Sequence, residues 1–431
     1  MAHVRPLRGF RYDLPRLGDA GLLLAPPYDV VDAAGRERIG ARSPHNCIHV
    51  ILPEGEGDAK YEVGARRFAA LEREALVRDA APSFYVYHQT FTSEGQQYTR
   101  KGFIGLIELT RFGAGPVLAH ERTLSGPKAD RLKLMRACEA HLELVFGMFS
   151  DPGRAWEAAT SRALGSAVLE CEFDGTHHAL YRVDDPAATA ALTDVLADKK
   201  IYIADGHHRY ETMCSFRAEL EAAGKGEVAR WGLIFLSNLD DPGLVVLPTH
   251  RLIHSVPGLD LAAALAQVEP FFTITREKLP ESGAAVRARL AEAGARGAAF
   301  GLAAPATGEL VVLALRPDFD PAAAGLQHLA PALQRLDVAL LHELILDRGF
   351  GVTREAQAQN TNIRYYKSTD EALAVARAGG SDVQLVCFMN PTPVRDVRAV
   401  CDSGEVMPQK STFFYPKIPT GLVFHDLKEG L

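Results

Sequence analysis

The sequence predicts an α+β protein (mixed α/β) with more than one domain, in which mixed sheets alternate with interleaved helices. Three observations lead to this prediction. The chain has 431 residues, more than one ordinary hydrophobic core accommodates. Segments with the 3.6-residue apolar period of helices alternate along the chain with β-branched and aromatic segments typical of strands. Hairpin turn signals recur between neighbouring strand segments, which argues against a clean doubly wound sheet.

A first domain is predicted over residues 1–150. It begins with a proline-rich stretch, and the paired prolines of Ala25-Pro-Pro-Tyr-Asp29 impose an extended path on the chain. The elements predicted after this stretch are a helix at 58–78, paired strands at 83–90 and 99–109, a helix at 130–140 and a buried strand at 142–149.

A second domain is predicted over residues 151–255 and a third over residues 256–431, with the reservation that their segments can intertwine. The second contains strand patterns at 167–173, 178–183, 201–204, 231–236 and 244–247, and helix patterns at 186–197 and 210–220. The third contains helix patterns at 259–268, 284–293, 336–345 and 369–378, and strand patterns at 298–302, 310–315 and 383–389.

The composition is that of a soluble globular protein, with 47% hydrophobic and 23% charged residues. The formal net charge of −7 argues against a protein that coats nucleic acid. Six scattered cysteines without paired spacing predict reduced thiols, as in a cytoplasm. No secretion signal is evident, and no run approaches the roughly 18 to 20 apolar residues of a membrane span. We therefore expect a cytoplasmic protein that does not enter a membrane.

The most informative segment is a strand–turn–helix junction near the middle of the chain. An apolar strand at 201–204 is followed by a sharp turn and by a helix pattern. The residues at this junction are Asp205, Gly206, His207, His208 and Arg209. The N–H groups and the positive dipole end of a helix favour an anion there. Arginine adds a planar fork that matches phosphate or carboxylate, so the junction predicts a phosphate-binding turn.

Two other interpretations of the junction are weaker. Asp-Gly also occurs at such junctions because the turn itself requires it. A zinc site is disfavoured, since adjacent histidine side chains diverge and the chain has no Cys-x-x-Cys or His-Glu-x-x-His pattern to complete a ligand set.

A second charged segment covers His120 to Leu132, between a strand and a helix, with a turn expected at Gly126-Pro127. Its candidate residues are Glu121, Lys128 and Arg131. Cations at the start of a helix oppose the helix dipole, and an anion between them would remove the conflict. The alternative is a solvated loop with a helix cap at Asp130.

A third segment runs from Met407 to Leu422 and combines cations with aromatic residues. Its candidate residues are Lys410, Ser411, Thr412 and Lys417. The Lys-Ser-Thr sequence resembles the end of a Walker P-loop, but the upstream glycines are absent and a P-loop is rejected. We favour a lid or wall of a nucleotide pocket, because two lysines and a Ser-Thr pair are poor core material. The alternative is a strand edge that packs its aromatic residues into the core.

Three weaker features remain. The proline turn that ends in Tyr28 and Asp29 suits a structural turn as well as a site. His250 and Arg251 follow a strand pattern and offer a further anion contact. His342 lies in an apolar helix pattern, where we expect a half-buried histidine with its hydrogen bonds satisfied.

Taken together, four of these segments resemble the bacterial "domain of unknown function 1015" family, in order and over essentially the whole chain. They are residues 25–30, 120–131, 205–212 and 407–417. Locally, Asp-Gly-His-His-Arg before a helix is similar to the phosphate-binding box of the ParB and sulfiredoxin superfamily. That superfamily includes nucleotide-hydrolysing partition proteins, sulfiredoxins and kinases of free L-serine. The resemblance implies a nucleotide-binding element of this type around residues 200–220.

The resemblance implies that His207, His208 and Arg209 bind phosphate and that Asp205 lies beside the transferred group, and the residue types of the other segments suggest the remaining roles. The residues expected to contact phosphate or nucleotide are Gly206, His207, His208, Arg209, Lys128, Arg131, Lys410, Ser411, Thr412 and Lys417. The catalytic candidates are Asp205, His207, His208 and Glu121. Asp205 would lie beside the transferred group, and Asp205 or Glu121 would accept a hydroxyl proton. Asp205 is also the candidate Mg²⁺ ligand, since Mg²⁺ prefers carboxylates and phosphate oxygens.

The expected function is a nucleotide-dependent phosphotransferase, a kinase that uses ATP or ADP with Mg²⁺ and acts on a small hydroxylated metabolite such as free L-serine. The alternatives are a non-catalytic sensor of a nucleotide or phosphometabolite, and a metal-assisted phosphoesterase or nuclease. Sulfiredoxin chemistry is disfavoured because the box has no cysteine, and chromosome partition because no basic pair of helices is present. Nucleic acid is therefore not an expected partner. The oligomeric state is open, with a homodimer among the alternatives.

Overall fold

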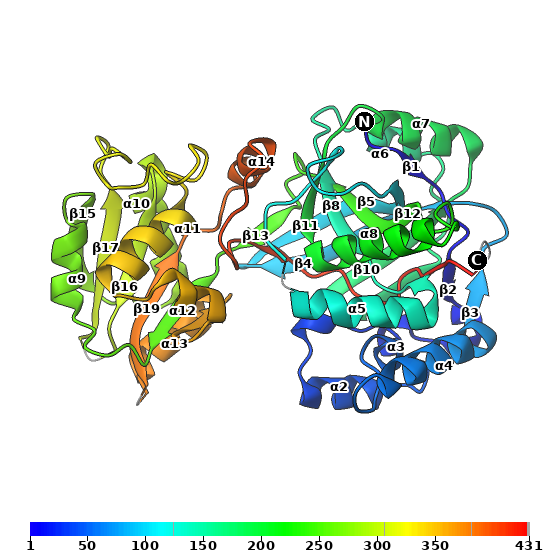
Figure 1. Ribbon diagram of the computed structural model, residues 1–431, viewed down its shortest axis with the longest axis horizontal. Coiled ribbons are helices and arrows are strands. Elements are labelled where there is room, and N and C mark those ends of the chain that lie inside the picture. The colour runs from blue at the N-terminus through cyan, green and yellow to red at the C-terminus, as the bar shows by residue number, and fades with distance from the viewer. Residues whose placement is uncertain (124, 306, 381, 429–431) are drawn as a thin grey trace. The chain divides into compact units, whose positions relative to one another are not determined.

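The computed structural model describes residues 1–123, 125–305, 307–380 and 382–428. The chain forms two compact units (Figure 1). Unit 1 consists of Met1–Ala119, Thr123–Val245 and Pro416–Leu431, and unit 2 of His120–Arg122 and Val246–Tyr415. Residues 1–150 and 151–245 thus belong largely to one unit. The chain passes to unit 2 near the boundary expected at 255, and its last segment returns to unit 1.

Unit 1 is built on a mixed sheet with the strand order β6-β11-β8-β12-β5-β4-β10-β9, and β1 pairs with β5. Its strands are β1 (Val4–Arg5), β4 (Phe84–Ser93), β5 (Gln96–Glu108), β6 (Val117–Leu118), β8 (Val145–Phe149), β9 (Leu169–Phe173), β10 (Thr176–Val183), β11 (Ile201–Asp205) and β12 (Trp231–Asn238). The pairs β11–β6 and β12–β8 are parallel, whereas the other pairs are antiparallel. The predicted mixed α+β class is therefore confirmed.

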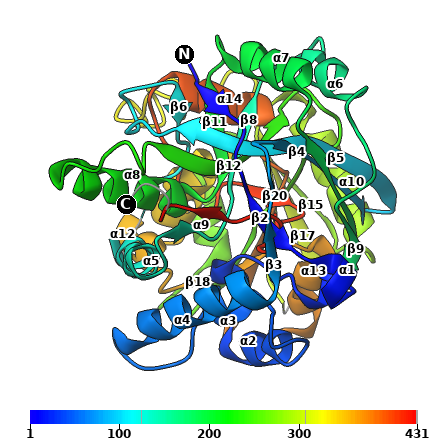
Figure 2. The same ribbon diagram turned by 90° about the vertical axis from the view of Figure 1, so that its right-hand side faces the viewer.

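Helices cover this sheet in separate groups. Helix α5 (Ser125–Cys138) packs against both α4 (Ala59–Glu74) and α8 (His207–Ala222), and Figure 1 shows α5 beside α8. In Figure 2, α4 lies with α2 (Ala33–Gly40) and α3 (Ile48–Ile51), whereas α6 (Ala155–Thr160) and α7 (Pro186–Leu196) lie at the opposite end of the unit. The apolar core under α4 and α5 includes Phe68, Leu71, Leu134 and Phe424.

The C-terminal segment is part of unit 1. Phe10 and Phe424 form an isolated antiparallel bridge, and the short strand β21 (His425–Asp426) pairs with β7 (Ala140–His141). The ring of Phe424 packs edge-on against those of Tyr12 and Phe68. These contacts hold the chain at Phe424–Asp426 in place and so limit the path of the segment that contains Lys417.

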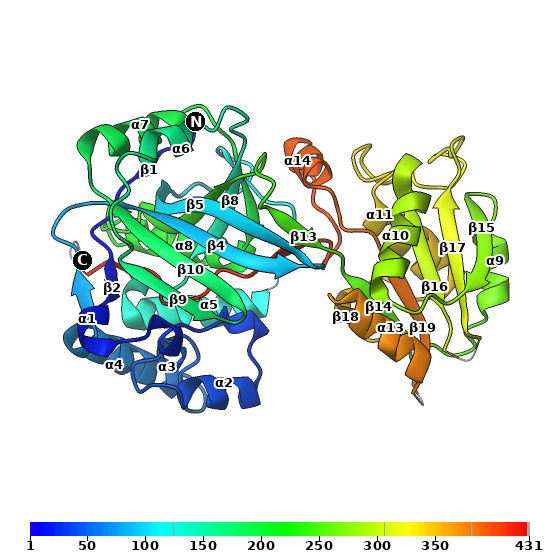
Figure 3. The ribbon, with the colours of Figure 1, turned by 180° about the vertical axis from the view of Figure 1, so that it is seen from behind.

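Unit 2 contains an antiparallel sheet with the order β15-β17-β16-β19-β14-β18. Its strands are β14 (His250–His254), β15 (Phe272–Lys278), β16 (Ala299–Ala303), β17 (Glu309–Leu315), β18 (Ile363–Tyr366) and β19 (Val383–Met389). Its helices include α9 (Leu261–Val268), α10 (Gly283–Ala293), α11 (Asp337–Leu340), α12 (Arg354–Gln359), α13 (Thr369–Ala378) and α14 (Val394–Asp402). Figures 1 and 3, which view the unit from opposite sides, show α11 and α10 on different faces of the sheet.

Several elements differ from the sequence predictions. The helix expected at 336–345 is the short α11 followed by a π-helix over Leu341–Gly349, because an apolar period of 3.6 residues does not separate the two helix types. The helix expected from 130 begins at Ser125, since proline is tolerated in the first turn of a helix. The turn expected at Gly126-Pro127 is therefore part of that helix. Strands β14, β15 and β18 were not predicted from the sequence.

Two further findings concern the cysteines and the lengths of the helices. The six cysteines form no disulfide, and five of them are buried. In the parts of the chain that the structure describes, helices with enough length and apolar character to cross a bilayer are absent.

Candidate functional site

The strand–turn–helix junction predicted at residues 201–220 is present in unit 1 as β11 and α8. Gly206 joins the two with a φ of 85°, in the left-handed region. A Cβ atom at this position would lie 2.9 Å from Nε of Arg209. Glycine is therefore required twice, by the backbone conformation and by the approach of the guanidinium group. Helix α8 begins without a side-chain cap.

Asp205 is the centre of an ion cluster at this junction. Its carboxylate accepts hydrogen bonds from Nζ of Lys417 and from Nη2 of Arg209. Arg209 also donates to the backbone carbonyl of Leu144 and is itself buried. Burial alone would raise the pKa of Asp205, but the charges of Lys417 and Arg209 outweigh it and hold that pKa well below its usual range. Asp205 thus stays ionised and holds both cations.

Lys417 is positioned by side chains of the hairpin β4–β5. Nε2 of Gln89 donates to the carbonyl of Lys417 at 3.1 Å, and Arg100 donates to the carbonyl of Pro416. Arg100 is fully buried, also donates to Oε1 of Gln89, and has a pKa lowered to about 10 by burial. Its Cζ atom lies 4.8 Å from the ring centre of Phe146. The backbone at 416–417 is therefore anchored on the sheet.

Arg131, another predicted cation of unit 1, lies in a neighbouring cluster. Its Nη1 is 3.6 Å from Oε2 of Glu143, and its Cζ is 4.2 Å from the ring centre of Tyr28. The backbone N–H of Tyr28 donates to Oε1 of Glu143 at 3.3 Å. Asp130 accepts hydrogen bonds from Arg131 and, at 2.7 Å, from Nζ of Lys60. The proline turn at 25–29 therefore meets the segment at 128–131.

Glu143 connects the two clusters, although sequence reasoning did not select it. Burial raises its pKa, and the nearby charges of Arg209 and Arg131 oppose that shift. A cavity of about 30 Å³, comparable with one or two water molecules, is lined by Arg131, Glu143 and Arg209. Glu143 stands in a segment expected as a buried strand, where a carboxylate needs a cationic partner. That mismatch was the one signal in the sequence that could have identified it.

The remaining predicted residues of unit 1 lie along α5 and α8. Nζ of Lys128 is 2.8 Å from a carboxylate oxygen of Glu211, which also accepts a hydrogen bond from Thr123. His207 is 5% exposed, whereas His208 is only partly covered. Leu124, in the same predicted segment as Lys128, lies outside the described residues.

The other four predicted residues belong to unit 2. The backbone N–H of Lys410 donates to Oε1 of Glu121 at 2.9 Å. Thr412 is joined to His120, whose Nε2 lies 2.9 Å from the threonine Oγ1. Ser411 is buried and its hydroxyl donates to the carbonyl of Pro408. The segments at 120–122 and 407–412 therefore meet in unit 2, whereas the predicted residues at 128–131, 205–209 and 417 lie in unit 1.

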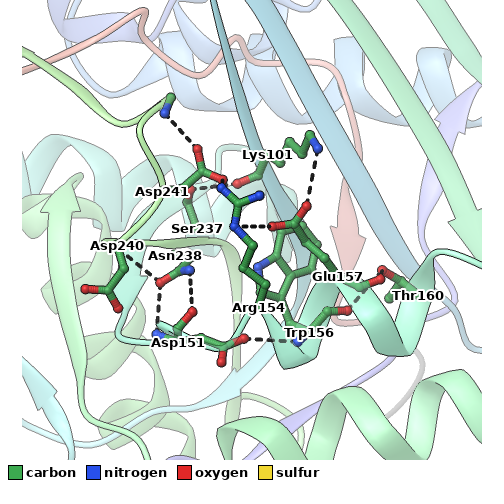
Figure 4. Close-up of polar contacts among 11 residues, drawn as sticks. Lys101, Asp151, Arg154, Trp156, Glu157, Thr160, Ser237, Asn238, Asp240 and Asp241 are labelled. Atoms are coloured by element: carbon green, nitrogen blue, oxygen red, sulfur yellow. Dashed lines mark hydrogen bonds and ion pairs between the residues drawn. The ribbon is translucent and has the colours of Figure 1, made fainter.

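A further polar cluster in unit 1, which sequence reasoning missed, surrounds the start of α6 (Figure 4). Asn238 exchanges two hydrogen bonds with the backbone of Asp151, at 2.7 and 2.9 Å. The Asp151 carboxylate accepts from the backbone N–H of Trp156 at 3.0 Å, and Lys101 pairs with Glu157 at 3.2 Å. These contacts join α6 to strands β5 and β12, so the cluster anchors α6 to the sheet.

The donor set at the junction does not fit Mg²⁺. The carboxylate oxygens of Asp205 are directed at Lys417 and Arg209, so a metal ion there would have to displace a cation. Among the described residues, groups of three or more histidine, cysteine, aspartate or glutamate side chains that could hold a metal ion are absent.

The fold and the site define a mixed α/β protein of two units, with a cation–carboxylate cluster at the start of a long helix. The chain belongs to the family described as "Protein of unknown function (DUF1015)", whose model matches residues 4–339. The family resemblance of the sequence is thereby confirmed. A search of the curated proteins finds no match.

Solved structures with distant similarity include three proteins. A conserved hypothetical protein from Pyrococcus furiosus is 13% identical over 73% of this chain and 94% of that chain, with a TM-score of 0.36. A free serine kinase in complex with AMP is 12% identical over 73% of this chain and 90% of that chain, with a TM-score of 0.36. SbnI with a C-terminal truncation, from Staphylococcus aureus, is 9% identical over 73% of this chain and 85% of that chain, with a TM-score of 0.33. Similarities this low carry no argument about activity.

Proposed function

We propose that the protein is a nucleotide-dependent phosphotransferase that moves a phosphoryl group from ATP or ADP to a hydroxyl group of a small metabolite, with free L-serine as the first acceptor to test. One observation carries the proposal. Lys417 and Arg209, far apart in the sequence, meet on Asp205 at the start of α8. Phosphoryl transfer depends mainly on positioning and on neutralising phosphate charge, which such an arrangement supplies.

The donor phosphates would bind at the amino end of α8. That end has no side-chain cap, and its dipole favours an anion. Lys417 is 18% exposed, so its ammonium group can exchange the Asp205 carboxylate for a phosphate oxygen without unfolding the site. Arg131 adds positive charge on the far side of Glu143.

In the proposed reaction, the hydroxyl oxygen of the acceptor forms a bond to the terminal phosphorus, the bond from that phosphorus to the bridging oxygen breaks, and ADP or AMP leaves. The hydroxyl proton passes to a base. A carboxylate whose pKa is held well below its usual range is a weak base, so Asp205 positions the cations instead. We assign proton acceptance to His208, the partly exposed imidazole of the first turn of α8. No step of this reaction uses a protein-bound metal ion.

A non-catalytic sensor is the second candidate. Arg209 already donates to Asp205 and to a carbonyl group, so its charge is satisfied before any ligand arrives. Such a site can bind a nucleotide without activating it.

A phosphoesterase would hydrolyse the donor and release inorganic phosphate.

The test is phosphorus NMR of the full chain with ATP or ADP, Mg²⁺ and L-serine. A new phosphomonoester supports the transferase. Inorganic phosphate alone indicates a phosphoesterase, and nucleotide-induced thermal stabilisation without any product indicates a sensor. Either of these results overturns the proposed activity.

The matched variants are Lys417→Met and Lys428→Met. Both lysines lie in the C-terminal segment of unit 1, but Lys428 pairs with Glu72 at 2.8 Å. Loss of one charge-assisted hydrogen bond, about 1.5–3 kcal/mol, weakens nucleotide binding about tenfold or more in Lys417→Met. Lys428→Met should bind as the unaltered protein does. Equal nucleotide affinity in the two variants, measured by calorimetry, would show that Lys417 does not take part in nucleotide binding.

A further inference from the structure

Unit 2 contains a cavity that the proposed phosphotransferase site does not use. Its volume is about 460 Å³, within the range of about 300–1,000 Å³ that is usual for small-molecule sites. Among the residues that line it are Arg122, Leu333, His342, Glu343, Tyr365 and Met407. Arg122 and Met407 come from the two segments, at 120–122 and 407–412, that meet in this unit.

One wall of the cavity is formed by an unusual element. His342 and Glu343 belong to the π-helix over Leu341–Gly349, which continues directly from α11. π-Helical segments are rare and are found frequently at functional sites, because they place side chains where a regular helix cannot. Gln357, also in the lining, donates to the carbonyl of His342 at 3.2 Å and fixes this turn.

A buried cation lies directly behind the wall. Arg251 is 1% exposed, and its Nη2 is 3.4 Å from Nε2 of His342. Its Cζ is 5.6 Å from the ring centre of Tyr365. Its guanidinium donates to the carbonyls of Thr249 and Lys410, while Nε has no hydrogen-bond partner. No carboxylate among the described residues forms an ion pair with it.

A buried charge without a counterion is unfavourable, and an anion in the cavity would relieve it. Burial lowers the pKa of Arg251 to about 10, which leaves it charged at neutral pH. The pKa of His342 is lowered to about 3, again by burial, so its ring is neutral and adds no charge of its own.

The formal charges of the lining balance, with Arg122 and Arg354 against Glu343 and Glu405, so the excess positive charge near the cavity comes from the buried Arg251. Glu343 lies 2.5 Å from Nη2 of Arg354 and 3.2 Å from Nε2 of His328, so its charge is neutralised within the wall. Arg122 is exposed and has no ion-pair partner within the described part of the chain. With Arg251 behind the wall, the guanidinium groups of Arg122, Arg354 and Arg251 outnumber the carboxylates of Glu343 and Glu405 by one.

We propose that this cavity binds a small organic anion, whose carboxylate or phosphate monoester group faces Arg122 and the wall in front of Arg251, and whose apolar body contacts Leu333 and Met407. The apolar part of the lining also includes Leu329, Ala330 and Val406, which suits a hydrocarbon or aromatic body. This site is independent of the proposed phosphotransferase site in unit 1.

The probes are phenylacetate, phenyl phosphate and the neutral phenylacetamide, titrated into the full chain by calorimetry. At least one of the two anions should bind, and at least tenfold more tightly than phenylacetamide. The better of the two identifies the anionic group. Equal affinity for the anions and the amide, or binding of none of the three probes, overturns the proposal.

Two variants locate the anion, and one serves as a control. Arg122→Ala should weaken binding of the better anion about tenfold, whereas Arg395→Ala, on the exposed face of α14, should not change it. Arg251→Met should abolish the preference for the anion over phenylacetamide. If Arg251→Met does not fold, Arg122→Glu tests the preference for the anion over phenylacetamide at an exposed position. Unchanged affinity in both Arg122 variants overturns the assignment, and unchanged binding in Lys417→Met separates this site from the one in unit 1.

Discussion

At the scale of single residues, Gly206 is the position where backbone and charge constraints coincide. Its φ of 85° disfavours any side chain, and the Arg209 guanidinium fills the space of a Cβ atom. Arg209 could not keep its hydrogen bond to Asp205 if a methyl group displaced it. The conformation of one residue therefore determines whether the ion cluster forms.

Gly206→Ala should lower the free energy of unfolding by about 1–3 kcal/mol from backbone strain, and by more from the displaced guanidinium. Gly224→Ala is the control at the other end of α8. Its φ is 76°, but no atom lies within 4 Å of an added Cβ. Urea denaturation should show a smaller loss, about 1 kcal/mol, for Gly224→Ala. Equal losses of unfolding free energy in the two variants would mean that the contact with Arg209 does not affect stability.

At the scale of elements, the hairpin β4–β5 acts on the site from a distance. Gln89 accepts from Arg100 and donates to the carbonyl of Lys417, so two strands hold the backbone that presents the lysine. Both side chains are fully buried. The hairpin was expected from its alternating sequence, but its connection to residue 417 was not.

Gln89→Leu keeps the size of the side chain and removes both interactions. The buried guanidinium of Arg100 then loses an acceptor, which should lower the free energy of unfolding by about 1–3 kcal/mol. Nucleotide binding should weaken less than in Lys417→Met, because the lysine is still present. Gln97→Leu, at an exposed position of β5, is the control. If chemical denaturation gives the same stability for both variants, the anchoring of Lys417 by Gln89 is not significant.

At the scale of the whole molecule, buried histidines make stability depend on pH. In unit 1, burial lowers the pKa of His178 and His425 to about 4, and that of His141 well below its usual value. An unfolded chain binds these protons near pH 6.5. Below that pH the unfolded state holds protons that the native state does not, until the native pKa values are reached. Stability is therefore fully present above pH 6.5 and falls as the pH decreases toward 4.

Each such histidine contributes a slope of about 1.4 kcal/mol per pH unit within this window. Unfolding followed by tryptophan fluorescence reports unit 1, which contains both Trp156 and Trp231. The free energy of unfolding should fall steeply between pH 6 and pH 4.5. His141→Phe removes one titrating histidine, so the slope of the unfolding free energy against pH should decrease by about 1.4 kcal/mol per pH unit. The variant should also be more stable, because neither ring nitrogen of His141 has a hydrogen-bond partner. Equal stability of the unaltered protein at pH 7.5 and pH 5 would contradict the expectation.

Local structure was largely accessible from the sequence, as the junction at 201–222 shows. An apolar run, Asp-Gly and a helical period are adjacent in the chain, so their effect on the backbone is nearly independent of the fold. The same holds for the hairpin at 84–108 and for the helices at 186–196 and 369–378. The functional roles assigned to the junction remain predictions.

The sequence by itself determined the mixed class, the family and the charged segments from which any site must be built. The tertiary structure decided which charges meet: Lys417 with Asp205, Arg131 with Glu143, and Glu121 with the backbone of Lys410. It also placed these groups in two units and formed the π-helix beside the unit 2 cavity. The physical reason is the separation along the chain over which each kind of interaction acts. Backbone preferences act over a few residues, whereas a buried charge finds its partner only when the whole chain has been packed.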